Sequence, residues 1–218
     1  MTYIKKNINR KGFTIVELVV VVGIIAVISS IVVTGSQKFD STILLTNLSY
    51  EIALSIREAQ SAGLQVKEFK SGTASATFNS GYGVTFYTNN ADNSVNNTDY
   101  ILFADLITSG SAGDNVYNGD SNGGSEFVKK YSTRRGNVIE KFCGVMAVSG
   151  VEQCSDSSGG LSYLNIVFVR PNPDATFKSN TAVAYRAAKI YLKSAENTHR
   201  AVRIESTGQI SVCSNVSC

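Results

Sequence analysis

Residues Lys11 to Val33 read KGFTIVELVVVVGIIAVISSIVV, and this stretch decides how the rest of the chain is organised. The part from Phe13 to Val33 contains 21 residues and a single charged side chain, Glu17. At about 1.5 Å per residue, a helix of this length crosses the hydrocarbon core of a bilayer. The stretch therefore predicts a transmembrane helix near the N-terminus.

The charges that precede this helix predict its orientation. Lys5, Lys6, Arg10 and Lys11 lie before it, and the first twelve residues contain no acidic side chain. Because positive charge is retained on the cytoplasmic side, we expect a cytoplasmic N-terminus and an exported C-terminal domain. These four residues contribute +4 to the formal net charge of +3, which leaves −1 for the rest of the chain, so the basic balance gives no argument for a nucleic-acid partner.

Three interpretations of the segment compete. A secretory signal peptide has a shorter apolar core and a small-residue cleavage site, which Ile31 to Val33 does not offer. A plain single-span anchor fits the length but gives no reason for a carboxylate at Glu17, which costs roughly 2.5–3.5 kcal/mol in the hydrocarbon unless the side chain reaches the interface. The third interpretation must explain the carboxylate.

The order of residues from Lys11 to Glu17, followed by an unbroken apolar run, closely resembles the leader and N-terminal helix of type IV prepilins. The resemblance implies that a prepilin peptidase cuts between Gly12 and Phe13 and methylates the new N-terminus. Glu17 then becomes the fifth mature residue. Its carboxylate could pair with the Phe13 amine of a neighbouring subunit, which would neutralise two costly charges only on assembly.

The helical pattern continues beyond the membrane segment and then changes to alternation. Apolar residues recur at spacings of three and four, at Phe39, Ile43, Leu44, Leu48, Ile52, Ile56, Ala59 and Ala62. Gly63 is a plausible helix stop. From about Gln65 onward, alternating runs predict strands at Tyr82–Thr88, Tyr100–Phe103, Val138–Val148, Leu161–Arg170, Ala182–Leu192, Ala201–Glu205 and Gln209–Cys213.

These patterns predict an α+β chain with a leader at 1–12, a long helix at 13–64 (13–33 transmembrane) and an exported β-rich domain at 65–218. Turn residues at 206–208 predict a hairpin in which Val202 and Ile204 face the same core as Ile210 and Val212. The layout resembles the pilin fold, in which one long helix packs on an antiparallel sheet. Segments 57–60, 82–84, 100–105 and 202–212 resemble the GspH/FimT branch of minor pilins and type II secretion pseudopilins.

The cysteines Cys143, Cys154, Cys213 and Cys218 all lie in the C-terminal third. An even number in an exported segment indicates two disulfides, and four cysteines allow three pairings. We favour the local bridges Cys143–Cys154 and Cys213–Cys218, and Cys143–Cys213 with Cys154–Cys218 stays open. A zinc site is disfavoured, because there is no Cys-x-x-Cys pair and His199 is the only histidine.

Two polar loops carry patterns associated with chemistry. Residues 119–123 match the Gly-x-Ser-x-Gly nucleophile pattern, but the strand, helix and nearby histidine that it requires are not predicted there. The stretch from Asp114 to Asp120 offers oxygen ligands for calcium without the spacing of an EF-hand, and plain turns favour the same residues. We therefore predict no catalytic residue, no cofactor and no metal, and leave calcium in the second loop as an alternative.

The basic cluster of the exported domain comprises Lys129, Lys130, Arg134 and Arg135, with Tyr131 as a stacking partner. Such a cluster could contact phosphates. We favour a solvated connection instead. Gly208 to Ser211 also departs from the basic pattern that DNA-binding members of the resembled branch are expected to carry, so nucleic acid is not our predicted partner.

The prediction for function is a structural subunit, most like a minor one, of a type IV pilus or a type II secretion pseudopilus. The resemblance implies other pilin subunits, prepilin peptidase and an inner-membrane assembly platform as partners, with lipid around the helix before assembly. It implies a single-pass position in the cytoplasmic membrane, then a filament in the periplasm or at the cell surface. The alternatives are a DNA-binding minor pilin and an anchored domain that forms no filament.

Overall fold

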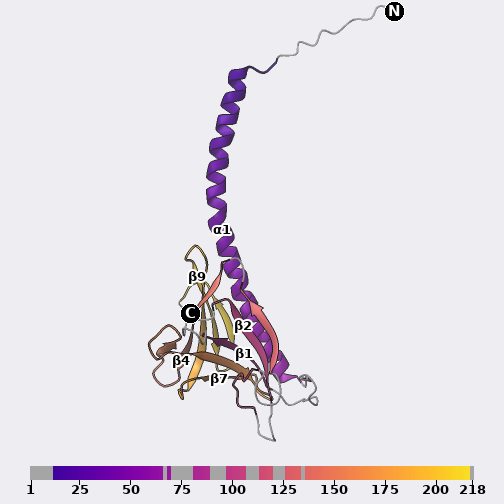
Figure 1. Ribbon diagram of the computed structural model, residues 1–218, viewed down its shortest axis with the longest axis vertical. Helices are drawn as coiled ribbons and strands as arrows, with labels where there is room; N and C mark the ends of the chain where they lie inside the picture. The colour runs from indigo at the N-terminus through magenta and orange to yellow at the C-terminus, as the bar shows by residue number, and fades with distance from the viewer. Residues whose placement is uncertain are drawn as a thin grey trace, which may run out of the picture. The chain divides into compact units, whose positions relative to one another are not determined.

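The computed structural model describes residues 12–65, 68–69, 81–88, 97–106, 113–119, 126–133 and 136–216, without the side chains of 33–40. The chain divides into two compact units, Met1–Asp40 and Ser41–Cys218. The helix α1 (Ile15–Leu64) begins in the first unit and contributes its C-terminal part to the second. The strands belong to the second unit, as Figure 1 shows.

The strands form two five-stranded sheets, and every described pairing is antiparallel. The first sheet has the order β3 (Phe127–Ser132), β2 (Asp99–Asp105), β1 (Gly81–Tyr87), β6 (Tyr163–Phe168), β7 (Ala175–Ser179). The second has the order β10 (Ile210–Cys213), β9 (His199–Glu205), β8 (Tyr185–Lys193), β4 (Val138–Met146), β5 (Glu152–Cys154). The predicted α+β fold of a long helix with an antiparallel sheet domain is confirmed.

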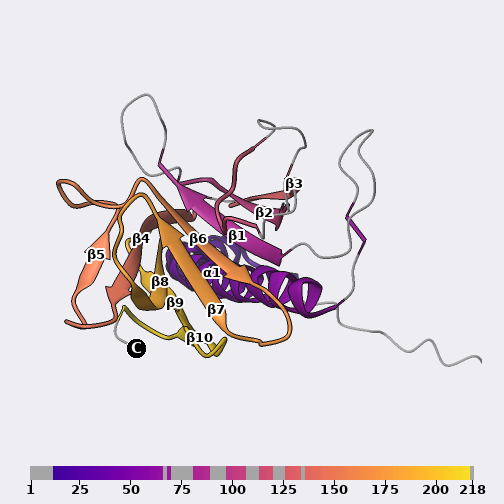
Figure 2. The ribbon, with the colours of Figure 1, turned by 90° about the horizontal axis from the view of Figure 1, so that it is seen from below.

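One hydrophobic core joins the C-terminal part of α1 to both sheets. Figure 2 shows strands of both sheets around this part of the helix. The helix contributes Leu45, Leu48, Ile52, Ile56 and Ala59. The sheets contribute large side chains from their inner faces, including Tyr82, Phe86, Tyr100, Phe142, Ile166, Phe168 and Ile190. Burial of this apolar surface, at about 25 cal/mol per Å², is the main term that stabilises the domain.

The apolar stripe of the helix differs from the predicted one near its start. Ile43 was expected in the core, but its side chain is 43% exposed, whereas Leu45 is 1% exposed. Ile43 lies four residues after Phe39 and Leu45 lies three residues before Leu48, so a spacing of three or four alone could not choose between them. Phe39, another predicted member, has a side chain outside the described residues.

All seven predicted strand segments contain strands, but three further strands were missed. The missed strands are β3, β5 and β7. β3 is mostly exposed and β5 has only three residues, so neither shows a strong alternation of buried and exposed positions. β7 follows Pro171 and Pro173 and is an edge strand. The predicted hairpin is confirmed, since Ile210 pairs with Ile204 and Val212 pairs with Val202.

The end of α1 is packed directly against the sheets. Gln60 Nε2 donates to the backbone carbonyls of Pro173 (3.0 Å) and Gly208 (3.1 Å). At Gly63, a Cβ atom would lie 2.3 Å from the carbonyl oxygen of Phe168 in β6. The glycine near the predicted helix end therefore serves mainly to let the helix approach a strand, and the helix itself continues to Leu64.

We predict that Gly63→Ala destabilises the domain even though alanine favours helix. Helix propensity alone would stabilise by about 1 kcal/mol. The new methyl group would instead meet a hydrogen-bonded strand backbone, and overpacking of this kind costs about 1–3 kcal/mol. Urea unfolding of the detergent-solubilised chain, followed by tyrosine fluorescence, measures the difference. The exposed Arg57→Ala is the control on the same helix, and a more stable Gly63→Ala variant would contradict the packing argument.

Candidate processing and assembly site

The helix begins two residues after the predicted scissile bond. Gly12, Phe13 and Thr14 precede α1, and the hydroxyl Oγ1 of Thr14 accepts a hydrogen bond from the backbone N–H of Glu17 at 3.2 Å. Thr14 is thus the N-cap residue, and Thr14-x-x-Glu17 has the sequence of a capping box. With Thr14 as the N-cap, the helix begins after the Gly12–Phe13 peptide bond, and this bond lies outside the helix.

The residues on both sides of that bond are accessible. Gly12 is exposed, and among the described residues no atom outside its chain neighbours lies within 4 Å of where its Cβ would be. Phe13 is 76% exposed. A protease binds a short non-helical segment around the bond that it cuts, and this arrangement leaves such a segment available. The structure is compatible with cleavage there, and the roles of Gly12 and Phe13 remain predictions.

Glu17 lies in the first turn of α1 among exposed apolar side chains. A carboxylate in this turn interacts favourably with the partial positive charge of the helix N-terminus, by typically 0.3–1 kcal/mol. Capping therefore gives Glu17 a local role within one subunit. This interaction offsets only part of the roughly 2.5–3.5 kcal/mol that a carboxylate costs in hydrocarbon, and the role of Glu17 in assembly stays a prediction.

The segment Ile15–Val32 is long and apolar enough to cross a membrane by its length and composition. Its mean hydropathy is 2.9, and 0% of it is buried within the protein. This absence of burial separates it from the core helix of a soluble domain, whose apolar residues are covered by its own chain. The segment therefore needs an apolar environment from outside its own chain, either lipid or other subunits.

Residues 7–33 match the model of the prokaryotic N-terminal methylation motif. This motif is that of type IV prepilin-like proteins, so the match supports a place for the chain in the pilin superfamily and a structural, prepilin-processed role. The match ends within the long helix and does not extend into the β-rich domain. No curated protein and no solved structure was found to match the chain.

The β-rich domain carries a disulfide between Cys143 and Cys154, which face each other on β4 and β5. This confirms the favoured local bridge and excludes Cys143–Cys213. Cys218 lies outside the described residues, so the bridge Cys213–Cys218 stays a prediction. Cys143, Cys154 and Cys213 share a second, smaller apolar cluster with Tyr191 and Ala201, separate from the main core.

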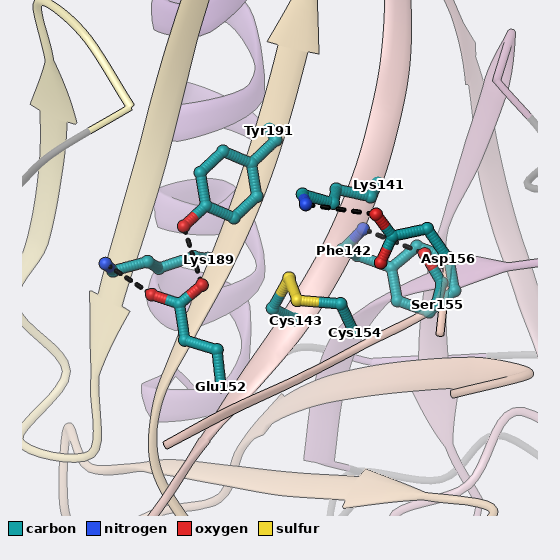
Figure 3. The surroundings of a disulfide bond; sticks show 9 residues. All are labelled: Lys141, Phe142, Cys143, Glu152, Cys154, Ser155, Asp156, Lys189 and Tyr191. Atoms are coloured by element: carbon teal, nitrogen blue, oxygen red, sulfur yellow. Dashed lines mark hydrogen bonds and ion pairs between the residues drawn. A yellow bond between two sulfur atoms is a disulfide. The ribbon is translucent and has the colours of Figure 1, made fainter. Parts of the chain in front are cut away.

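A partly buried ion pair lies beside this disulfide, as Figure 3 shows. Glu152 Oε1 accepts from Lys189 Nζ at 2.7 Å, and Glu152 Oε2 accepts from the Tyr191 hydroxyl at 2.7 Å. Burial by itself would raise the pKa of Glu152, but these two bonds outweigh burial and hold that pKa below its usual value. The bonds connect the short edge strand β5 to β8, across β4.

The described residues contain one group of His, Cys, Asp and Glu side chains close enough to share an ion, namely Cys143, Glu152 and Cys154. Its two sulfur atoms are bonded to each other, and its carboxylate is engaged by Lys189 and Tyr191. Thiolate ligands are therefore not available there in the disulfide form.

The basic cluster adopts a different structure from the one predicted. Lys129 and Lys130 lie on the edge strand β3 and not in a connection. Lys130 Nζ forms an ion pair with Asp99 Oδ2 at 2.7 Å, and Lys129 Nζ lies 4.4 Å from the centre of the Tyr131 ring. Charged side chains on an edge strand oppose pairing with other chains. Arg134 and Arg135 lie outside the described residues.

Two buried carboxylates that sequence reasoning missed hold the loop Gly113–Gly119. Asp105 at the end of β2 accepts from Asn115 N at 3.1 Å, and Glu126 accepts from Asn118 N at 2.7 Å and Leu106 N at 3.2 Å. Burial raises the pKa of both, that of Asp105 to about 7. No motif marks these residues, because their partners are backbone groups.

The loop considered for calcium is held partly by its own turn. Asp114 accepts from the N–H of Val116 at 2.9 Å and from Asn118 Nδ2 at 3.0 Å, which is the geometry expected of an Asx turn. Asp120 and the residues 120–123 of the Gly-x-Ser-x-Gly pattern lie outside the described residues.

His199, the first residue of β9, lies 3.4 Å from Glu140 Oε1 and is half-exposed.

We predict that replacing both Cys143 and Cys154 by serine lowers the free energy of unfolding by about 2–3 kcal/mol. The bridge closes a loop with a sequence separation of 11. Without the bridge the unfolded chain has more conformational entropy, and for a loop of this size the gain corresponds to about this free energy at 25 °C. Urea unfolding without reductant keeps the remaining cysteines in their native state. An unfolding free energy equal to that of the wild type would show that the bridge does not constrain the domain.

We predict that Asp105→Asn stabilises the domain at pH 7.5 and leaves it unchanged near pH 4. The folded chain binds the Asp105 proton more tightly than the unfolded chain does, because burial raises this pKa from 3.8 to about 7. Protonated Asp105 therefore contributes stability at low pH, and this contribution is lost as the pH rises from about 4 to 7. Asparagine retains an acceptor for Asn115 N without the charge.

Thermal unfolding midpoints at the two pH values test this expectation. The exposed Asp174→Asn is the matched control, because it removes one carboxylate from the same domain without altering a buried group. Equal effects of the two substitutions at both pH values would contradict the role given to Asp105.

Proposed function

We propose that the protein is a structural subunit of a type IV pilus or a type II secretion pseudopilus. In this proposal residues 1–12 form a leader that a prepilin peptidase removes, and residues 13–33 form part of the filament core. The β-rich domain at 65–218 then lies at the filament surface. The methylation-motif match over residues 7–33 supports processing, and the exposed apolar helix supports assembly with other subunits.

One observation carries the proposal furthest. Ile15–Val32 is a helix whose apolar surface is not covered by its own chain, yet its first turn includes a carboxylate. Neighbouring copies of the same helix supply an apolar surface and, after cleavage, a cationic amine at Phe13. Pairing Glu17 with that amine would neutralise both charges in the filament. A monomeric anchor offers no such partner.

The proposal includes the finer assignments as well. The resemblance to the GspH/FimT branch supports a minor or initiating subunit. We infer a single-pass position in the cytoplasmic membrane, with the C-terminal domain outside and lipid around the helix, before an assembly platform extracts the subunit. The leader charges support this orientation. DNA capture is not favoured, because Lys130 pairs with Asp99 and Lys129 lies over Tyr131.

Expression of the full chain with and without a prepilin peptidase tests processing by intact mass. We expect a peptidase-dependent loss of residues 1–12 and the addition of one methyl group. The matched control is Gly12→Val, which adds a branched side chain at the scissile bond and should remain uncut. A chain that stays uncleaved with active peptidase, or one cut near Ser30, would overturn the proposal.

Glu17→Gln separates filament assembly from simple anchoring. Glutamine retains the size and polarity of the side chain but cannot neutralise an amine. We expect the variant to be inserted and processed normally and to be absent from sheared or purified filaments of a host that assembles the wild type. Unchanged incorporation of Glu17→Gln would show that charge pairing is not required.

A further inference from the structure

The two faces of the first sheet differ in composition. The inner face is apolar, whereas the outer face carries polar and aromatic side chains. Val84, Leu102 and Ile166 are in the core, so their strand neighbours project to the opposite face. Thr85 pairs directly with Asn165 on β6, and Tyr87 pairs directly with Tyr163. These two pairs lie two residues apart and therefore share the outer face.

The loop Gly113–Gly119 lies against this face and is held there by specific contacts. The Tyr117 ring packs against Phe103, with centroids 5.4 Å apart. The backbone carbonyl of Asn115 accepts from Asn165 Nδ2 at 3.3 Å, and the buried Asp105 accepts from Asn115 N. The loop therefore forms a wall over the sheet, and Tyr117 is brought close to the strand residues.

A cleft of 360 Å³ lies between this loop and the sheet. Its lining consists of three tyrosines, four polar residues and two aliphatic residues, namely Tyr87, Tyr117, Tyr163, Thr85, Thr88, Ser162, Asn165, Ile101 and Val116. Its volume is within the range of small-ligand sites, about 300–1,000 Å³. Every described residue that lines it is uncharged.

An unsatisfied acceptor lies in the wall of the cleft. Asn165 is 1% exposed, and its Oδ1 atom is buried without a hydrogen-bond partner among the described residues. A buried acceptor left unpaired costs about 1–3 kcal/mol, so such groups normally have a partner. A hydroxyl or amide N–H of a ligand would supply the missing donor.

A second cleft of 630 Å³ adjoins the first, because both are lined by Thr88 and Ser162. The second cleft is formed by the polar loop Ser155–Gly160 together with Leu161 and Asn180. Thr88 donates to the Ser162 carbonyl through both its N–H (2.8 Å) and its hydroxyl (3.1 Å), which fixes the boundary between the clefts. Together they offer room for a ligand longer than one small ring.

We propose that these joined clefts bind a neutral oligosaccharide. Aromatic rings provide flat apolar surfaces for the C–H faces of sugar rings, while the threonine, serine and asparagine groups exchange hydrogen bonds with sugar hydroxyls. A phosphate-bearing ligand would need cations, which the first cleft does not provide. An apolar peptide side chain would leave Asn165 Oδ1 unpaired. The site lies within the unit Ser41–Cys218, so it does not depend on leader processing.

Binding is tested with the full chain in a detergent that contains no sugar, because glycosidic detergents would compete. The probes are a tetramer of N-acetylglucosamine and a tetramer of glucose, titrated with tyrosine fluorescence or calorimetry as the readout. We expect saturable binding of at least one tetramer and a rise of the thermal unfolding midpoint in its presence. No saturable binding of either tetramer at millimolar concentration would overturn the proposal.

Variants locate the binding site. Tyr163→Ala and Tyr117→Ala should each weaken binding tenfold or more, equivalent to about 1.4 kcal/mol. The control is Tyr50→Ala, which removes a tyrosine that is 55% exposed on α1, away from the cleft. Tyr163→Phe retains the ring and should retain most of the affinity. It provides the comparison needed if Tyr163→Ala perturbs folding. Equal affinity of the wild type and both cleft variants would overturn the site, whereas failed leader processing would contradict only the filament assignment.

Discussion

The structure depends on one constraint: a single continuous helix has to satisfy two different environments. From Ile15 to Val32 its side chains are uncovered by the rest of the chain and need lipid or other subunits. From Leu45 to Ala62 one face of the same helix is buried against two sheets. The helix backbone satisfies its own hydrogen bonds in both settings, which is why this element can serve both.

The features near the start of the helix follow from this constraint. Because Thr14 caps the N-terminus of the helix, the Gly12–Phe13 bond lies outside the helix, and a processing enzyme would not have to unwind the helix to reach that bond. Glu17 both belongs to the capping sequence and adds a charge to an apolar surface. The first role is complete within one subunit, whereas the second creates an unfavourable state that a partner can relieve. Together they make the proposed assembly conditional on cleavage.

Two peripheral segments of the domain, the strand β5 and the loop Gly113–Gly119, are held by polar or covalent contacts outside the hydrophobic core. The disulfide Cys143–Cys154 and the bonds of Glu152 to Lys189 and Tyr191 fasten the short strand β5, which contributes little apolar surface of its own. Asp105 and Glu126 fasten the loop Gly113–Gly119 in a comparable way. That loop forms one wall of the cleft beside Asn165, so two buried carboxylates shape the proposed binding site.

The sequence by itself determined the elements that depend on local pattern. It was sufficient for the apolar helix and for the hairpin pairing of Val202 and Ile204 with Val212 and Ile210, and it favoured the local bridge Cys143–Cys154 among the pairings that it left open. Hydropathy, turn residues and short sequence separation are all encoded over a few residues. Only the tertiary structure decided the exposure of Ile43, the weakly patterned strands β3 and β5, and the placement of Tyr117, Tyr163 and Asn165 around one cleft. These outcomes depend on contacts between residues far apart in the chain, which no local periodicity records.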